Sequence, residues 1–164
     1  MLDAIAVWEQ SYEINRLLDG RGDGHYVFQS LCNLGAAHIQ FGHLKKAGSY
    51  LQMALEMGES LGEPDHVTRI RGYLALLSHL RGNLSEANRE YGEIAVELRD
   101  IGNMRAYSIV LRHHADLLLR EKRTRTEAWE KIRTSKAVAE ANSYEDLAAY
   151  ARLSYCVYRK CRTA

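Results

Sequence analysis

The sequence predicts an all-α fold, a solenoid of antiparallel helix hairpins. Apolar residues recur at spacings of three and four between short turns that contain glycine, and no segment shows sustained strand alternation. The 164-residue chain has a single proline, Pro64. Several positions also repeat at an offset of forty residues. Such a period predicts helix pairs that stack on one another to bury a continuous core.

The forty-residue offset links glycines and apolar residues of the same type. The identical pairs are Gly42 and Gly82, Gly62 and Gly102, Leu34 and Leu74, Leu44 and Leu84, and Ala47 and Ala87. The helix after each turn also repeats a buried stripe, which reads Ala47, Leu51, Ala54, Leu55, Gly58, Leu61 and then Ala87, Tyr91, Ile94, Ala95, Leu98, Ile101. Ala128 and Ile132 continue this series, and Ala4, Trp8, Ser11, Tyr12 and Leu18 precede it.

These patterns divide the chain into eight helices in one solenoid domain that spans residues 1–164. The expected elements are a lone helix near 2–19, hairpins near 25–62, 65–101 and 103–142, and a lone terminal helix near 144–161. The lone first element matches a second helix and the last one a first helix, which is expected of a segment cut from a longer array or of a solenoid with a lone capping helix at each end. Spacing typical of capping boxes predicts side-chain caps at three helix starts, by Asn83 with Glu86, Thr124 with Glu127, and Ser143 with Asp146.

The repeated residues resemble a known family. Leu34-Gly35, Gly42, Ala47, Leu51 and Ala54 look like the tetratricopeptide repeat (TPR) consensus, and Leu74-Ala75, Gly82, Ala87 and Tyr91 look like a second copy. The standard motif has 34 residues, so this chain is similar to the extended variety of kinesin light chains and Leu-Gly-Asn spindle adaptors. The resemblance implies about three repeats in a right-handed superhelix, with the first helix of each pair lining a concave face.

The same resemblance gives candidate partner-binding residues on the first helices. They are Gln29, Asn33, Arg69, Tyr73, His79, Arg112, His113 and Asp116. Four of these eight are Arg or His and one is acidic, which favours an acidic or amide-rich peptide along the groove. The alternative is that they are solvated polar residues on the exposed side of each helix. Cys32, Ala36, Gly72 and Leu76 stand where the chaperone-binding subclass carries its carboxylate clamp, so recognition of chaperone tails is not expected.

No catalytic residue, metal ligand or cofactor is predicted, and the chain is not expected to be an enzyme. His113 and Asp116 share a helical face, but a zinc site needs three or four converging ligands. The repeat register instead places His114 in the partly buried slot of Leu74 and turns His113 toward the groove.

The predicted function is therefore a protein-interaction module that binds a peptide or helix of a partner, as a scaffold or adaptor. The alternative is a ligand- or peptide-sensing regulatory domain of a larger signalling or transcription protein. Residues 1–100 carry nine Lys/Arg against fourteen Asp/Glu, whereas residues 101–164 carry thirteen against seven. This asymmetry, with an apolar terminal face at Leu147, Ala151 and Tyr155, predicts head-to-tail self-association.

Other partners and compartments are disfavoured. The net charge of +1 and the lack of aromatic residues among the basic runs 120–125 and 159–162 argue against nucleic acid. No stretch is apolar enough to span a membrane, and the start Met1-Leu2-Asp3-Ala4-Ile5 lacks a basic region and an apolar core, so a cytoplasmic protein is expected, with a nuclear one as the alternative. Cys32, Cys156 and Cys161 read as reduced thiols, and Arg21-Gly22-Asp23 as a turn rather than an integrin motif.

Overall fold

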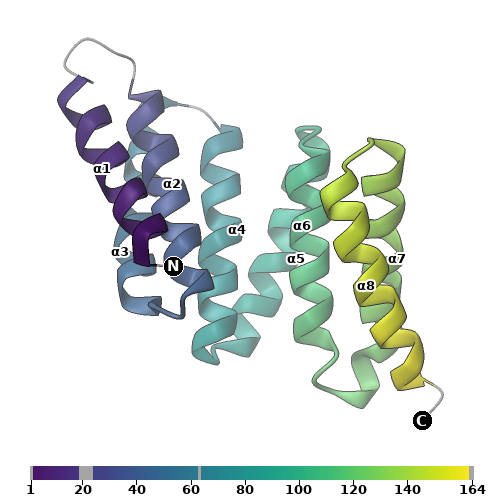
Figure 1. Cartoon of the computed structure of the whole chain (residues 1–164). Coiled ribbons are helices and arrows are strands. Elements are labelled where there is room, and N and C mark those ends of the chain that lie inside the picture. Colours follow the sequence, from purple (N-terminus) through teal and green to yellow (C-terminus); the bar gives the residue numbers. More distant parts are fainter. Residues whose placement is uncertain (1, 19–23, 63, 163–164) are drawn as a thin grey trace. The chain divides into compact units, whose positions relative to one another are not determined.

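The computed structural model describes residues 2–18, 24–62 and 64–162, of which the side chains of residues 2–4, 155 and 157–162 lie outside the description. The described residues form eight α-helices and one short 3-10 helix, with no strand among them (Figure 1). The helices are α1 (Leu2–Leu18), α2 (His25–Gln40), α3 (Leu44–Leu61), α4 (Pro64–Arg81), α5 (Leu84–Asp100), α6 (Met104–Leu118), η2 (Lys122–Thr124), α7 (Arg125–Ala141) and α8 (Glu145–Arg162). The predicted all-α class, with eight helices, is confirmed.

The chain forms two compact units, residues 1–82 and residues 83–164. Unit 1 contains α1 to α4 and unit 2 contains α5 to α8. The two helices of the expected hairpin 65–101 belong to different units, so that pairing stays a prediction, as does the single solenoid domain. Below, α2, α4, α6 and α8 are called first helices and α1, α3, α5 and α7 second helices.

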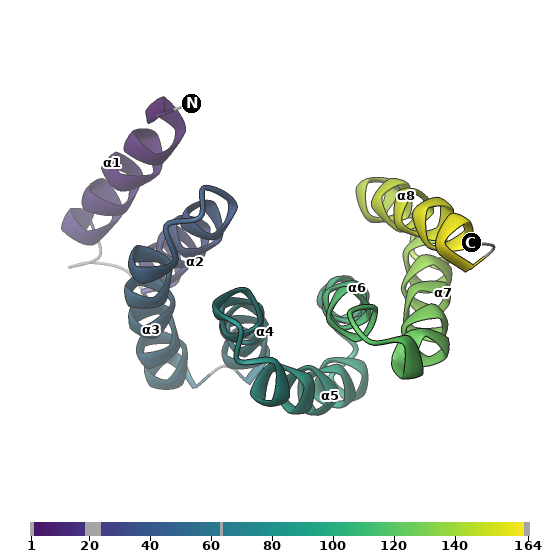
Figure 2. The ribbon, with the colours of Figure 1, turned by 90° about the horizontal axis from the view of Figure 1, so that it is seen from below.

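In unit 1, α2 packs against α1, α3 and α4 (Figure 2). The core between these helices contains Phe28, Leu31, Leu51 and Ile70, all buried. α1 contributes Ile5 to the interior and packs its Tyr12 edge-on against Tyr50 of α3, with ring centroids 6.5 Å apart. The Asn15 amide donates a hydrogen bond of 2.8 Å to Ser30 Oγ on α2. One side of α1 is therefore fixed by packing and by this bond.

The approach of α2 to α3 depends on a glycine. A Cβ placed at Gly35 would lie 2.6 Å from Leu51 Cδ2, closer than real Cβ atoms come. Leu51 is fully buried, as are Ala47 and Ala54 on the same stripe of α3. The small side chains let the two helices approach while Leu51 fills the space beside Gly35.

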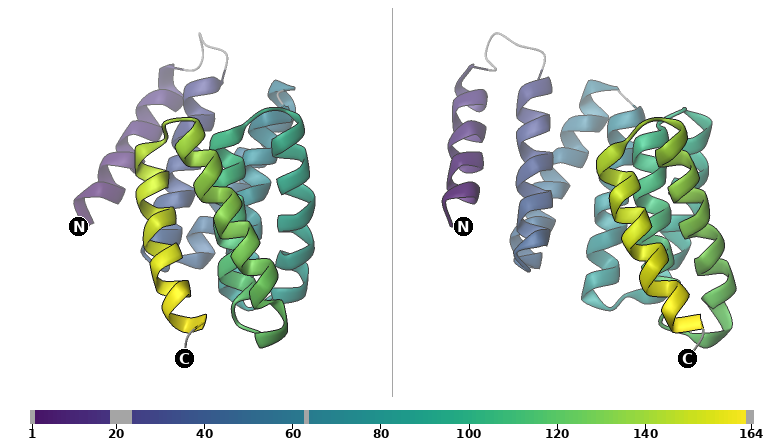
Figure 3. Two further views of the ribbon diagram at one scale, coloured as in Figure 1. Left: turned by 90° about the vertical axis from the view of Figure 1, so that its right-hand side faces the viewer. Right: turned by 45° about the vertical axis from the view of Figure 1, so that its right-hand side comes forward.

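In unit 2, α6 packs between α5 and α7, and α8 packs along α7 (Figure 3). The closest polar contact between α6 and α7 joins two buried serines. Ser108 Oγ donates to the Ser135 carbonyl at 3.0 Å, and Ser135 Oγ donates to the Ser108 carbonyl at 2.8 Å. These reciprocal bonds satisfy both hydroxyls in the core and hold the two helices at short range.

The predicted buried stripes are confirmed at most positions of α3, α5 and α7. Tyr91, Ile94, Leu98, Ala128 and Ile132 are all buried, as are their counterparts on α3. Leu55, Leu61, Ser11 and Tyr12 are half-buried, and Ile101, Trp8 and Leu18 are exposed, whereas the side chain of Ala4 lies outside the described residues. Ile101 lies beyond the last residue of α5, where it leaves the helix face that the stripe follows. Trp8 and Leu18 lie on α1, which packs mainly against one described helix, α2, so these two side chains are less covered than their counterparts.

Three of the turns that connect consecutive helices share one hydrogen-bond pattern. In each turn, one residue has a positive φ, and the amide of the next residue donates to the carbonyl five residues before it. The residues with positive φ are Gly42 (73°), Gly102 (78°) and Ser143 (56°). Glycine reaches this region without a steric cost, whereas serine has a Cβ that crowds the carbonyl.

The predicted side-chain caps are wrong. Neither Asn83 nor Thr124 makes a side-chain cap hydrogen bond, and the Thr124 hydroxyl donates to the Leu118 and Glu121 carbonyls instead. Ser143 lies in the left-handed turn position, two residues before α8 begins. The cap that does form was not predicted, with Asn103 Oδ1 accepting from the Ala106 amide at 3.0 Å.

Replacing Ser143 with glycine is expected to stabilise the protein. The Ser143→Gly substitution removes the left-handed Cβ, a cost of about 1–2 kcal/mol, but gives the unfolded chain more freedom. We expect the free energy of unfolding to rise by about 0.5–1 kcal/mol. Urea unfolding followed by circular dichroism measures it, and Ser60→Gly, inside helix α3, is the control that should lower it.

Gly35 and Gly92 form a matched pair because both lie inside helices. A Cβ at Gly35 meets Leu51, whereas one at Gly92 meets nothing within 4 Å. Gly35→Ala should therefore lower the free energy of unfolding by about 1–3 kcal/mol through overpacking, and Gly92→Ala should raise it by about 0.5–1 kcal/mol through helix propensity. Equal effects of the two substitutions in thermal or urea unfolding would contradict the packing role of Gly35.

Candidate functional site

The candidate site is the polar surface of the first helices, described separately in each unit. In Figure 2, α2 and α4 lie next to each other in unit 1, and α6 and α8 do so in unit 2. We call the outward polar positions of these helices the first-helix surface.

In unit 1, this surface is built on a pair of amides one helical turn apart. Gln29 and Asn33 of α2 are four residues apart, so their side chains share a face. The Gln29 Nε2 group donates a hydrogen bond of 3.1 Å to Asn33 Oδ1. Both side chains are half-buried, and their mutual bond orients the remaining amide groups.

Arg69 joins α4 to this pair. One of its terminal nitrogens donates to Gln29 Oε1 at 3.4 Å and reaches Cys32 Sγ at 3.8 Å. The guanidinium also lies over the Phe28 ring, 5.4 Å from its centroid. The sequence prediction that placed Gln29 and Arg69 at equivalent positions thus corresponds to a direct contact between neighbouring first helices.

Cys32 lies beneath this contact as a buried thiol. Burial raises its pKa to about 11, and the nearby Arg69 charge offsets part of that increase. The thiol is therefore protonated at neutral pH and is a poor nucleophile. Cys156 is also a free thiol, and it is exposed on α8.

Tyr73 and His79 complete the predicted residues of α4 and differ in accessibility. Tyr73 is half-buried and packs against the core of unit 1. His79 is buried, with 6% of its surface exposed, so it does not belong to the surface that was predicted to include it. His79 shares a helix face with Ala75 and Thr68, four and eleven residues earlier, and both are buried, so this side of α4 faces the interior.

In unit 2, the predicted residues Arg112, His113 and Asp116 occupy one stretch of α6, and all are half-buried. The Arg112 guanidinium lies 3.3 Å from His113 Nε2. Because guanidinium only donates, this contact makes Nε2 the acceptor. Arg112 also lies over the Tyr150 ring of α8, 5.5 Å from its centroid.

Tyr150 was missed by the sequence analysis. It is exposed and stands on α8 at the repeat position that Arg69 holds on α4 and Gln29 holds on α2. Extending the repeat offset to the last helix, with the one-residue insertion near residue 120, is the signal that finds it.

A second missed contact joins the starts of α6 and α8. Arg105 forms a bidentate ion pair with Asp146 and lies over the Tyr144 ring at 5.5 Å. The hydrogen bond from Arg105 lowers the pKa of Asp146. This pairing neutralises one of the arginines on the first helices.

His114 lies behind the surface and confirms the predicted register. It is buried, its Nε2 is 2.9 Å from Asn88 Oδ1 of α5, and its ring stacks on Tyr91 at 5.5 Å. Burial, assisted by the Lys131 charge, lowers its pKa to about 4. In the part of the chain that the structure describes, no three His, Cys, Asp or Glu side chains gather where a metal ion could bind.

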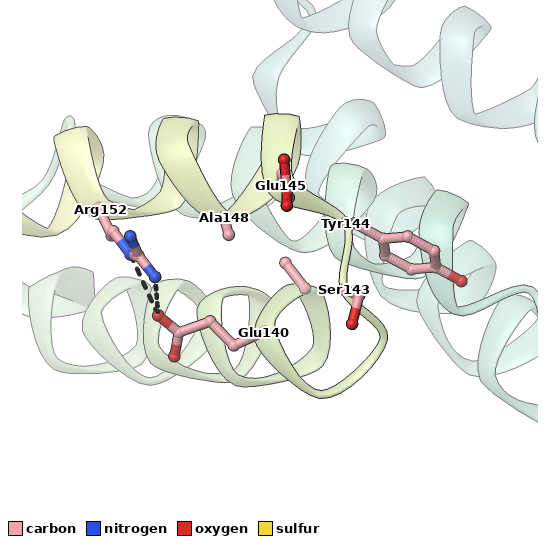
Figure 4. A pocket seen from close by; sticks show the side chains of 7 residues that line it. Glu140, Ser143, Tyr144, Glu145, Ala148 and Arg152 are labelled. Carbon is pink, nitrogen blue, oxygen red and sulfur yellow. Dashed lines mark hydrogen bonds and ion pairs between the residues drawn. The ribbon is translucent and has the colours of Figure 1, made fainter.

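A separate groove of about 530 Å³ lies between α7 and α8 (Figure 4). Arg152 of α8 crosses it to Glu140 of α7, with nitrogen-to-oxygen distances of 3.2 and 3.1 Å. The groove is lined by Tyr144 and Ala148 but also by second-helix residues, so it is distinct from the first-helix surface.

The basic runs have different outcomes. Residues 120–125 form a turn around η2, exposed apart from Thr124, where Arg123 is paired with Glu121 at 2.6 Å. The side chains of 159–162, including Cys161, and the whole of Arg21-Gly22-Asp23 lie outside the described residues. No helix among the described residues has the length and apolar character that crossing a membrane requires.

Comparisons with known proteins bear on the fold alone. No family model matches the chain, and no curated protein matches it in sequence. Fifteen chains of solved structures match its fold. One is BtubC (BKLC) from P. vanneervenii, with a TM-score of 0.60 and 18% sequence identity over 95% of this chain and 72% of that chain. This similarity supports a helical repeat fold, the coarser part of the predicted TPR resemblance.

The burial of His114 predicts a pH dependence of stability. The unfolded histidine has a pKa near 6.5 and the folded one near 4. The unfolded state therefore binds more protons between these values, and stability falls as the pH drops from about 6.5 to about 4. The loss attributable to His114 is expected to be roughly 2–3 kcal/mol.

Urea unfolding at pH 7 and pH 4.5 measures this loss in the wild type and in His114→Leu. Leucine is the residue at the equivalent position 74, and the Asn88 partner is exposed, so the variant should fold. The variant should lose less stability on acidification than the wild type. The same pH slope in both proteins would assign the acid sensitivity to other groups.

Proposed function

We propose that this chain is a protein-interaction module that holds an extended or helical segment of a partner protein against its first-helix surface. The fold supports a scaffold of this kind, because stacked helix pairs present a preformed surface and leave the ordering cost mainly to the ligand. The observation that carries the proposal is the linked set Gln29, Asn33 and Arg69, in which polar side chains from two neighbouring helices are held in position by each other.

The chemistry of this surface favours a peptide with acidic or amide groups. Arg69 and Arg112 each lie over an aromatic ring, Phe28 and Tyr150, which fixes the guanidinium plane. A guanidinium held in this way can donate two parallel bonds to one carboxylate at a lower entropy cost. The amides of Gln29 and Asn33 can pair with a peptide backbone beside it.

The proposal is for binding without catalysis. Its residues act as donors, acceptors and aromatic platforms, and none is assigned a chemical step. The regulatory alternative, a sensing domain within a larger protein, stays a prediction.

The test compares binding to an array of synthetic peptides graded in net charge. The wild type should retain acidic peptides best. Arg112→Glu should weaken that binding by about tenfold or more, since one lost charge-assisted hydrogen bond is worth about 1.5–3 kcal/mol. Arg69→Gln should weaken this binding as well. Glutamine is chosen here because a glutamate at this half-buried position would place a carboxylate in the core.

The matched control is Arg133→Glu on α7, an exposed arginine that is paired with Glu130 and lies on a second helix. It changes the net charge by the same amount as Arg112→Glu and should leave binding nearly unchanged. Equal losses in both variants would reduce the effect to long-range charge. Undiminished binding by a folded Arg112→Glu protein would overturn the proposed surface.

A further inference from the structure

The two terminal helices each carry an apolar side that no described part of the chain covers. On α1, Val7, Ile14 and Leu17 are spaced by seven and three residues and are 60%, 55% and 77% exposed. Their spacing places them on one helical stripe. The opposite side of α1 carries Ile5, Tyr12 and Asn15, which contact the rest of unit 1.

Trp8 shows what is missing from α1. By the repeat register, Trp8 corresponds to Leu51 of α3, Tyr91 of α5 and Ile132 of α7. Those three side chains are 0%, 0% and 1% exposed, whereas Trp8 is 39% exposed. Leu51 of α3 is buried against Gly35 of α2, the first helix that comes directly before α3 in the chain. Among the described residues, no first helix covers Trp8 in this way.

α8, the other terminal helix, also has an exposed apolar stripe. Its Leu147, Ala148 and Ala151 are buried against α6 and α7, so the terminal face predicted from Leu147 and Ala151 is not the exposed one. The exposed stripe carries Ala149, Leu153 and Cys156, at spacings of four and three. On α6, the preceding first helix, the position equivalent to Ala149 is Ser108. The Ser108 hydroxyl hydrogen-bonds the Ser135 carbonyl of α7.

Charge distinguishes the two ends. α1 contains three acidic residues and one basic residue, whereas α8 contains four basic residues and two acidic ones. An α1 stripe placed against a second α1 would bring like charges together, and so would an α8 stripe against α8. The pairing of α1 with α8 brings opposite charges together.

We infer that α8 of one copy of this chain docks on the exposed stripe of α1 of a second copy. The contact would join a first helix to a second helix through the exposed apolar stripe of each. It would bury Val7 and Ile14 against Leu153. Because the two surfaces differ, the contact is heterologous.

Two exposed substitutions block the two surfaces separately. Ile14→Glu blocks α1, and Leu153→Glu blocks α8, since each would bury an unpaired carboxylate in an apolar contact. Met53→Glu on α3 is the matched control, because Met53 is also exposed and lies on neither stripe. Circular dichroism and thermal unfolding verify that all three variants fold.

Sedimentation equilibrium over a range of protein concentrations gives the test. The wild type and Met53→Glu should associate. Each blocking variant alone should need a protein concentration at least about tenfold higher than the wild type to associate. An equimolar mixture of the two blocking variants should form a heterodimer that grows no further, because each protein supplies the surface that the other has lost. Association of the wild type should also weaken as salt is raised.

Three outcomes would overturn the inference. If the wild type stays monomeric, the α1 stripe is covered by another protein or by a further helix of a longer chain and not by a second copy. A Leu153→Glu protein that still dimerises alone points to contact between two α1 helices. A mixture that stays monomeric excludes the complementary pairing itself.

Discussion

The close approach of helices at small side chains is the constraint on which both units depend. Gly35 admits Leu51 at a distance that no Cβ would allow, and Ala47 and Ala54 keep α3 near its neighbours. In unit 2, Ser108 and Ser135 take this role and exchange hydrogen bonds across the α6 and α7 contact. Larger side chains at these positions would separate the helices and open voids that the remaining apolar residues could not fill.

This close packing also determines what the first helices can offer to a partner. Once one side of α2 and α4 is committed to the core, neighbouring first helices are near enough for Arg69 to reach Gln29. The same holds for Arg112 and Tyr150 on α6 and α8. The polar side chains are therefore arranged by the apolar contacts beneath them, and a change in the core would displace the surface as well.

The sequence predicted the features that depend on a repeated, averaged pattern. Eight helices and the buried positions of Leu51, Tyr91 and Ile132 follow from apolar spacing, to which many residues contribute. Features that depend on a single dihedral angle could not be predicted from the sequence. Ser143 matches a capping pattern in sequence, but its φ of 56° makes it the turn residue instead.

The candidate site shows the same division. Gln29, Asn33 and Arg69 were found because two well-matched repeats place them in register, and they proved to be in contact. Tyr150 and the pair of Arg105 with Asp146 were missed because the repeat offset was not extended past the one-residue insertion to α8. His79 was placed by register alone, although it shares a helix face with Thr68 and Ala75, which are buried.

Position within a repeat specifies how a side chain points, but its neighbours decide whether it is core or surface. Trp8 and Leu51 occupy the same repeat position, and among the described residues only Leu51 is covered by a first helix. Likewise, Tyr150 contacts Arg112 on the first-helix surface, whereas Leu153, three residues later on α8, is exposed. The proposed peptide binding and the proposed self-association thus use different residues of the same helix. A substitution at Leu153 can separate the two properties, because it leaves the Arg112 and Tyr150 contact in place.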